Sequence, residues 1–159
     1  MDLPGLMARE LDRHGLTASD LAVEVTESSA MENPSCAIEQ LAAIQAMGIR
    51  IAIDDYGAGY SSLAYIKRLP VDEIKIDKMF VMDLATNEND EVIVRTTIEL
   101  GHNLGLKVTA EGVENEESLA KLRHFGCDFG QGYFFSRPIP VDQLEKWLRE
   151  KREFFRRDA

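Results

Sequence analysis

Short runs of branched apolar residues alternate with segments of helical periodicity along the chain, and this alternation restricts the fold more than any other feature. The run Ile49-Arg-Ile-Ala-Ile53 follows a segment, 37–47, that has apolar residues at helical spacing and stops at Gly48. Strands that alternate with helices form parallel sheets with helical crossovers. The sequence predicts strands at 21–25, 49–53, 73–77, 106–110 and 127–135, and helices at 5–14, 37–47, 61–69, 88–104, 116–125 and 142–155.

Two helical segments carry apolar residues in a helical pattern. The residues at helical spacing in the first segment are Ile38, Leu41, Ala42 and Ile44, and the candidate core residues in the second are Val92, Ile93, Ile98 and Leu100.

Two parallel architectures compete, an open doubly wound sheet and a TIM-type (β/α)8 barrel. Nearly every predicted strand ends in an acidic or polar residue, and barrel active sites are built from several strand ends at one face. An open sheet usually concentrates its site at one switch point. A closed barrel takes about 250 residues, whereas this chain has 159. We therefore expect one domain, 1–159, with an incomplete barrel of five to six βα units.

The polar residues at the strand ends are the candidate site. They are Glu24, Glu27, Asp54, Asp55, Lys75, Glu111, Glu114 and Gln131. Carboxylates that converge repel one another, so such a site needs cations or protons. Oxygen ligands suit Mg²⁺ or Mn²⁺. An adjacent Asp-Asp pair can reach two metal ions about 3.5 to 4 Å apart, the spacing of two-metal phosphoryl hydrolysis, and Lys75 can position a water or stabilise negative charge.

Each of these residues also has a simpler interpretation. Glu24 or Glu114 alone is typical of a solvated loop, and Asp-Asp before a glycine is common turn chemistry. Lys75 in an alternating strand is also compatible with a solvent-facing side chain. The glycine loop after Asp55 does not match a P-loop, and the three histidines have no ligand spacing. The combination of strand ends, not any single residue, indicates a site.

Charge and cysteine usage exclude several classes of protein. The net charge is −10, from 28 acidic and 18 basic residues, which argues against binding to a nucleic-acid polymer or a membrane surface. The two cysteines lie far apart and do not indicate a disulfide framework. No apolar run reaches the roughly 18 residues of a membrane span, and residues 1–15 are too charged for a signal peptide. We expect a cytoplasmic protein without direct membrane insertion.

Five motifs in order make the chain similar to the EAL-domain family. They are Glu24-Val-Thr-Glu-Ser28, Ile53-Asp-Asp-Tyr-Gly-Ala-Gly-Tyr-Ser-Ser-Leu63, Lys75-Ile-Asp-Lys-Met-Phe-Val81, Ala110-Glu-Gly-Val-Glu114 and Gly130-Gln-Gly-Tyr-Phe-Phe-Ser-Arg-Pro138. The match is strongest over 20–140. The resemblance implies a (β/α)8 barrel with one antiparallel strand that hydrolyses cyclic di-GMP to pGpG with two Mg²⁺ or Mn²⁺ ions.

The resemblance also implies a role for each candidate residue. Glu24 is implied to bind the first metal ion, Asp54 to bridge the two ions, and Asp55 to bind the second. Glu111 is implied to lie near the attacking water and Lys75 to orient it. The implied role of Glu27 is to hold the loop from Asp54 to Ser62, which also contributes to dimerisation, while Glu114 and Gln131 line the site.

The chain departs from the family pattern in two respects. Tyr56 and Ala58 stand where Phe and Thr are commoner, and Ala58 lacks a hydroxyl that would help to hold the loop. No Glu-Ala-Leu tripeptide occurs in the sequence, so the resemblance implies that this strand and an Asn-x-Ser strand lie upstream of Met1. We expect an N-terminally truncated fragment with weakened or no activity alone, whose open sheet edges favour a homodimer or a complementing chain.

Two other functions remain open from the sequence. Degenerate family members bind cyclic di-GMP or proteins without hydrolysis, although they usually lose the catalytic residues present here. An unrelated barrel enzyme, such as a Schiff-base aldolase using Lys75, would leave the acidic strand ends unexplained.

Overall fold

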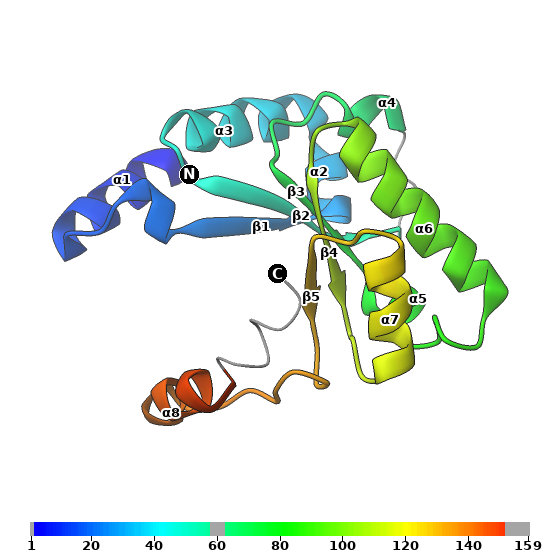
Figure 1. Cartoon of the computed structure of the whole chain (residues 1–159). Coiled ribbons are helices and arrows are strands. Elements are labelled where there is room, and N and C mark those ends of the chain that lie inside the picture. Colours follow the sequence, from blue (N-terminus) through cyan, green and yellow to red (C-terminus); the bar gives the residue numbers. More distant parts are fainter. Residues whose placement is uncertain (1, 58–62, 152–159) are drawn as a thin grey trace.

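The computed structural model describes residues 2–57 and 63–151 and contains one sheet of five parallel strands in the order β1-β2-β3-β4-β5 (Figure 1). The strands are β1 (Ala22–Thr26), β2 (Arg50–Tyr56), β3 (Glu73–Ile76), β4 (Lys107–Glu111) and β5 (Phe129–Gln131). The helices are α1 (Leu3–His14), η1 (Ala18–Asp20), α2 (Glu27–Glu32), α3 (Pro34–Ala46), α4 (Leu63–Ile66), α5 (Lys78–Val81), α6 (Glu88–Asn103), α7 (Glu116–His124) and α8 (Val141–Lys151). The predicted strand–helix alternation is confirmed.

Side-chain capping explains where three helices begin that the sequence patterns placed elsewhere or did not predict. The side chain of Asn33 accepts a hydrogen bond from the amide of Cys36, and Pro34 takes the first helical position, so α3 begins earlier than residue 37. Two short helices, α2 and α5, were not predicted. Thr26 caps α2 through the Ser29 amide, and Asp77 caps α5 through the Met79 amide. Helix α2 begins directly after β1, and α5 begins one capping residue beyond the end of β3. Both lie beside the site described below.

The fifth strand is much shorter than predicted. It ends at Gln131 instead of continuing to residue 135, because the chain turns at Gly132 against the loop after β4. A Cβ atom on Gly132 would lie only 2.2 Å from the Val113 carbonyl oxygen, so this contact requires glycine. The Val113 amide donates to the Gln131 carbonyl oxygen, and the Phe134 amide donates to that of Val113. The β4 and β5 ends are thereby joined.

The outer face of the sheet forms the core. Alternate strand residues are fully buried there beneath the helices; they include Ile51, Ile53, Ile74, Ile76, Val108 and Ala110. In Figure 1, α3, α6 and α7 lie along this face, and α8 lies apart from them. The residues between these positions point to the inner face, where Lys75 and Thr109 are buried polar residues. The sheet therefore separates an apolar outer layer from a polar interior.

Two candidate core residues of the second helical segment are wrong, because Val92 and Ile93 are exposed, whereas Ile98 is buried and Leu100 is partly buried. Among the apolar residues of α3, Leu41 and Ile44 are buried, Ile38 is partly buried and Ala42 is exposed. The buried stripe of α6 consists of Val94, Thr97, Ile98 and Gly101, which follows a 3–4–7 spacing. A Cβ on Gly101 would lie 2.4 Å from a methyl of Val108, so this stripe brings α6 close to β4.

Two aspartates fasten neighbouring strands in the same way. The Asp72 amide donates to the Ile51 carbonyl oxygen (2.9 Å), and the Ile51 amide donates to the Asp72 carboxylate (2.9 Å). Asp128 forms the equivalent pair with Val108, at 3.1 and 3.0 Å. Each aspartate precedes one strand and binds the start of the strand before it. These contacts fix strand register at the end of the sheet opposite the acidic strand ends.

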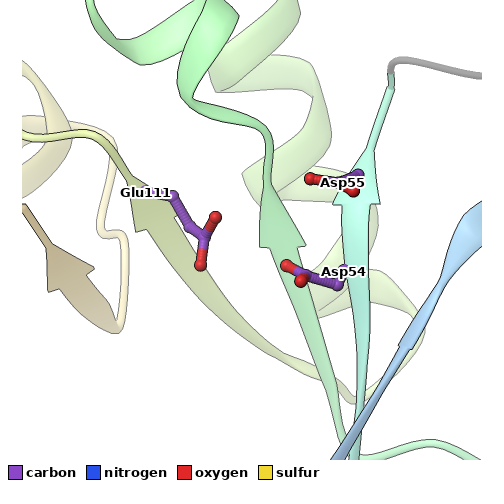
Figure 2. A group of neighbouring side chains, drawn as sticks. All are labelled: Asp54, Asp55 and Glu111. Carbon is purple, nitrogen blue, oxygen red and sulfur yellow. The ribbon is translucent and has the colours of Figure 1, made fainter.

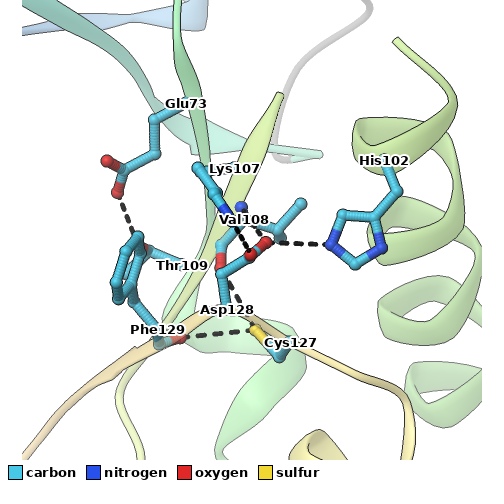
Figure 3. Close-up of polar contacts among 8 residues, drawn as sticks. All are labelled: Glu73, His102, Lys107, Val108, Thr109, Cys127, Asp128 and Phe129. Atoms are coloured by element: carbon cyan, nitrogen blue, oxygen red, sulfur yellow. Dashed lines mark hydrogen bonds and ion pairs between the residues drawn. The ribbon is translucent and has the colours of Figure 1, made fainter. Parts of the chain in front are cut away.

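The Asp128 carboxylate also contacts a lysine ammonium and a histidine ring (Figure 3). Lys107 Nζ lies 2.6 Å and His102 Nε2 2.9 Å from its carboxylate. Burial by itself raises the pKa of Asp128, but the bonds from Lys107, His102 and Val108 outweigh burial, so the pKa is lowered. The neighbouring Cys127 thiol is mainly affected by burial, which raises its pKa to about 11 and keeps it protonated.

Replacing Asp128 with Asn should lower the free energy of unfolding by about 1–2 kcal/mol at neutral pH, because the side chain loses its negative charge. The effect is modest because the exposed Lys107 ammonium is partly screened by water. The folded pKa lies below the unfolded value of 3.8, so the contribution of the carboxylate is complete above that value and is lost as the pH falls through the folded pKa. Urea unfolding at decreasing pH measures this difference. Asp142→Asn on exposed α8 is the control. If the difference in free energy of unfolding between the unmodified chain and Asp128→Asn does not shrink in acid, the stabilising role of the Asp128 carboxylate is contradicted.

Candidate metal centre and active site

The strand β2 carries an extra residue opposite β3 where its two aspartates lie. Ile53 pairs with Ile74 and Tyr56 pairs with Ile76, so Asp54 and Asp55 together face the single residue Lys75. Asp55 has a φ of +54°, in the left-handed region that non-glycine residues rarely adopt. Adjacent side chains of a regular strand point to opposite faces. The bulge instead brings both carboxylates toward the same side.

The two aspartates meet a glutamate from another strand (Figure 2). One oxygen each from Asp54, Asp55 and Glu111 lies within 4.8 Å of the others. Asp54 and Glu111 are partly buried, with side chains 23% and 18% exposed, whereas Asp55 is exposed. Glu111 ends β4, so the cluster is assembled by the parallel arrangement of β2 and β4 on either side of β3.

Lys75 lies at the centre of the acidic residues. Its side chain is 6% exposed, and its Nζ is 2.6 Å from Glu111, 2.9 Å from Glu24 and 3.2 Å from Asp54. Burial by itself lowers the pKa of Lys75, but the contacts with Glu111, Glu24 and Asp54 outweigh burial and raise the pKa above its ordinary value. The lysine is a stable cation. A Schiff-base nucleophile needs a neutral amine, so this geometry gives no support to an aldolase.

Glu27 holds the start of the glycine loop. Its side chain, buried at the beginning of α2, accepts a hydrogen bond from the Gly57 amide (3.0 Å). On the far side of residues 58–62, the Tyr65 hydroxyl donates to the Ala30 carbonyl oxygen of α2 (2.6 Å). Helix α2 thus anchors both flanks of this segment. The predicted loop contribution of Ala58, and the loop to Ser62, lie outside the described residues.

Glu114 and Gln131 line a cavity beside the acidic cluster. The cavity has a volume of about 300 Å³ and is also lined by Glu111. Sequence analysis missed Lys78, Met82 and Tyr133, which complete its wall together with Gly112 and Gly132. The available signal was position, because Lys78 and Tyr133 come within two residues of the ends of β3 and β5. The eight predicted site residues therefore lie at one end of the sheet, around the cluster and its cavity.

The donor set fits a hard divalent cation. Glu24, Asp54, Asp55 and Glu111 offer only carboxylate oxygens, which suit Mg²⁺ and Mn²⁺. Asp54 Oδ1 is buried and, within the described residues, has an ion pair with Lys75 but no properly directed hydrogen bond. A buried carboxylate oxygen without a hydrogen-bond donor can still bind a cation through its free lone pairs.

A comparison with protein families decides the classification, since the EAL domain model matches residues 2–138. The chain belongs to the EAL domain family. It is 45% identical over 142 residues to the cyclic di-GMP phosphodiesterase NbdA of Pseudomonas aeruginosa, covering 89% of the chain and 18% of NbdA. The chain spans 18–19% of the length of the first curated relatives it matches.

Solved structures of the EAL family show the same strand arrangement. The complex of PaMucR phosphodiesterase with c-di-GMP has a TM-score of 0.83 and 46% identity, over 86% of this chain and 56% of that one. The manganese and cyclic di-GMP complex of Klebsiella pneumoniae BlrP1 at pH 6 has a TM-score of 0.78 and 35% identity, over 84% and 34% of the two chains. The five parallel strands therefore match part of an EAL TIM-type barrel, which confirms the predicted fold.

The positive φ of Asp55 leads to a testable prediction. The free energy of unfolding of Asp55→Gly should be about 1 kcal/mol higher than that of Asp55→Ala, because glycine adopts a positive φ without the steric cost that alanine bears. Urea unfolding in chelator measures both variants without a contribution from bound metal. Asp83→Gly and Asp83→Ala provide the matched pair, since Asp83 is exposed and has no positive φ. Equal stabilities of the two Asp55 variants would contradict a strained bulge.

Proposed function

We propose that this chain is one part of a cyclic di-GMP phosphodiesterase domain that opens cyclic di-GMP to pGpG with two Mg²⁺ or Mn²⁺ ions. The observation that carries the proposal is the convergence of Asp54, Asp55 and Glu111 at the strand ends of an EAL fold, where the Lys75 ammonium contacts Asp54 and Glu111. Relatives support the substrate, since NbdA is named a cyclic di-GMP phosphodiesterase and PaMucR is solved with c-di-GMP. BlrP1 complexes with manganese and with calcium support the cation.

The proposed roles follow from where the side chains lie. Glu24, Asp54 and Asp55 would hold the ions, which when bound supply charge neutralisation and a more acidic water. Glu111 lies beside the Asp54–Asp55 pair and would accept the proton of the attacking water. Water adds to one phosphorus, the bond from that phosphorus to the ribose 3′ oxygen breaks, and the leaving oxygen takes up a proton. The chain need supply no oxidant or reductant.

The remaining residues would position the reactants. The permanent positive charge of Lys75 would orient the water and stabilise the negative charge that develops on the phosphate. Glu27 would keep the aspartate bulge in place through Gly57. Glu114 and Gln131 line the adjoining cavity, where they would contact the dinucleotide.

The proposal extends to the rest of the barrel. Within the described residues, the outer edges of β1 and β5 have no neighbouring strand. A closed barrel has no such edges, and this chain covers 56% of the PaMucR chain. We expect the site to be complete when a Glu-Ala-Leu strand and its neighbour lie along these edges, in the same polypeptide or from a second chain. The 159 residues by themselves should hydrolyse cyclic di-GMP slowly or not at all.

No helix within residues 2–57 and 63–151 combines the length and the apolar character that a membrane crossing requires.

Chromatographic detection of pGpG tests this function. A barrel completed by the missing strands should form pGpG with Mn²⁺, and Asp54→Ala should lower kcat/KM by about 10³-fold or more because it removes an oxygen ligand from the proposed ions. Asp142→Ala on α8 is the matched control and should retain activity. Cyclic di-GMP binding without turnover, unaffected by a chelator, would instead indicate a receptor module.

A further inference from the structure

Lys75 is bound to the same carboxylates that a cation would need. Its ammonium contacts Glu24 from β1, Asp54 from β2 and Glu111 from β4 at 2.6 to 3.2 Å. These residues come from three strands, and Lys75 rises between them from β3 with its side chain almost wholly buried. The ammonium therefore occupies the centre of the acidic group and not its rim.

An ammonium and a divalent ion cannot both take this central position. Mg²⁺ binds oxygen ligands at about 2.0–2.1 Å, closer than the ammonium lies to the same residues, so the two cations would repel each other. Asp54 Oδ1 would gain from an exchange, because it is buried and, among the described residues, has an ion pair with Lys75 but no hydrogen-bond partner. Binding at the centre thus requires the ammonium to withdraw from Glu24 and Asp54.

We propose that Lys75 is a built-in competitor of the divalent cation: it holds the three carboxylates together until the ion displaces it, and it thereby lowers the affinity for that ion. The inference rests on the metal site of the proposed function. The apparent affinity is reduced by the fraction of molecules in which the ammonium occupies the centre. Displacement also frees a tethered cation beside the substrate cavity, so metal loading and the availability of Lys75 for the substrate are coupled.

The competition is selective between the two proposed ions. Across the described ranges, Lys75 has ion pairs with Glu24, Asp54 and Glu111 but none with Asp55. Asp55 is also exposed, unlike the ammonium. An ion held by Glu24 and Asp54 needs two of the carboxylates that Lys75 contacts and competes strongly, whereas an ion held by Asp54 and Asp55 needs only one of them and competes less. The two ions should bind with different affinities, and Lys75 should control the weaker one.

Calorimetric titration with Mn²⁺ alone, on the chelator-treated barrel completed by the missing strands, tests the competition without substrate or turnover. Lys75→Met removes the ammonium and keeps an unbranched side chain, so it should bind the weaker Mn²⁺ about tenfold more tightly, or about 1.4 kcal/mol. Without Mn²⁺ it should melt at a lower temperature than the unmodified chain, and saturating Mn²⁺ should raise its melting temperature by more. Lys107→Met, which removes the ion pair to Asp128 at the other end of the sheet, should leave the Mn²⁺ affinity unchanged.

Lys75→Arg keeps the positive charge and should bind Mn²⁺ like the unmodified chain. Unchanged or weaker binding by Lys75→Met overturns the proposal, as does equal tightening by the Arg variant, which would indicate an effect of shape. If Lys75→Met is unfolded in chelator, recovery of its circular dichroism spectrum with Mn²⁺ supports the competition, and failure to recover overturns it. Mn²⁺ binding of equal affinity in all proteins refutes the competition alone, whereas no binding in any of them refutes the proposed metal site as well.

Discussion

The ion pairs of the buried Lys75 ammonium are the contacts on which the rest of the site depends. Carboxylates from β1, β2 and β4 converge on one inner face, and without a cation between them their repulsion and the cost of burial would push the strand ends apart. One ammonium in contact with all three compensates for both effects. The same contacts keep the lysine charged, which limits its chemistry to electrostatics and positioning.

The apolar outer layer of the sheet stabilises the fold and so offsets the cost of burying polar side chains on the inner face. Isoleucines and valines of β2, β3 and β4 are buried against the helices, and the aspartates at the opposite end of the sheet fasten neighbouring strands in register. Register decides which strand residues stand side by side. A shift of one residue between β3 and β4 would turn Glu111 away from Lys75, so hydrophobic packing far from the acidic residues maintains their geometry.

The sequence predicted the strands well because strands depend on local patterns. Alternating runs locate β1 to β4, and the polar residues at their ends converge as parallel strands require. The bulge was not predictable from one strand, since it is a mismatch between Ile53–Tyr56 and Ile74–Ile76. The exposed positions of Val92 and Ile93 reflect which stripe of α6 packs on β4, and the direction of Lys75 depends on neighbours from three other strands. These features come from tertiary contacts.

The bulge also bears on the number of acidic ligands that β2 presents. In an uninterrupted strand, two consecutive aspartates would point to opposite faces, and one of them would enter the apolar layer. A single additional residue between Ile53 and Tyr56 makes the pair usable on one face. Removal of one residue between Ile53 and Tyr56 would restore the regular alternation and leave one carboxylate of the pair on the inner face, so the length of β2, and not its composition alone, decides how many acidic ligands this strand presents.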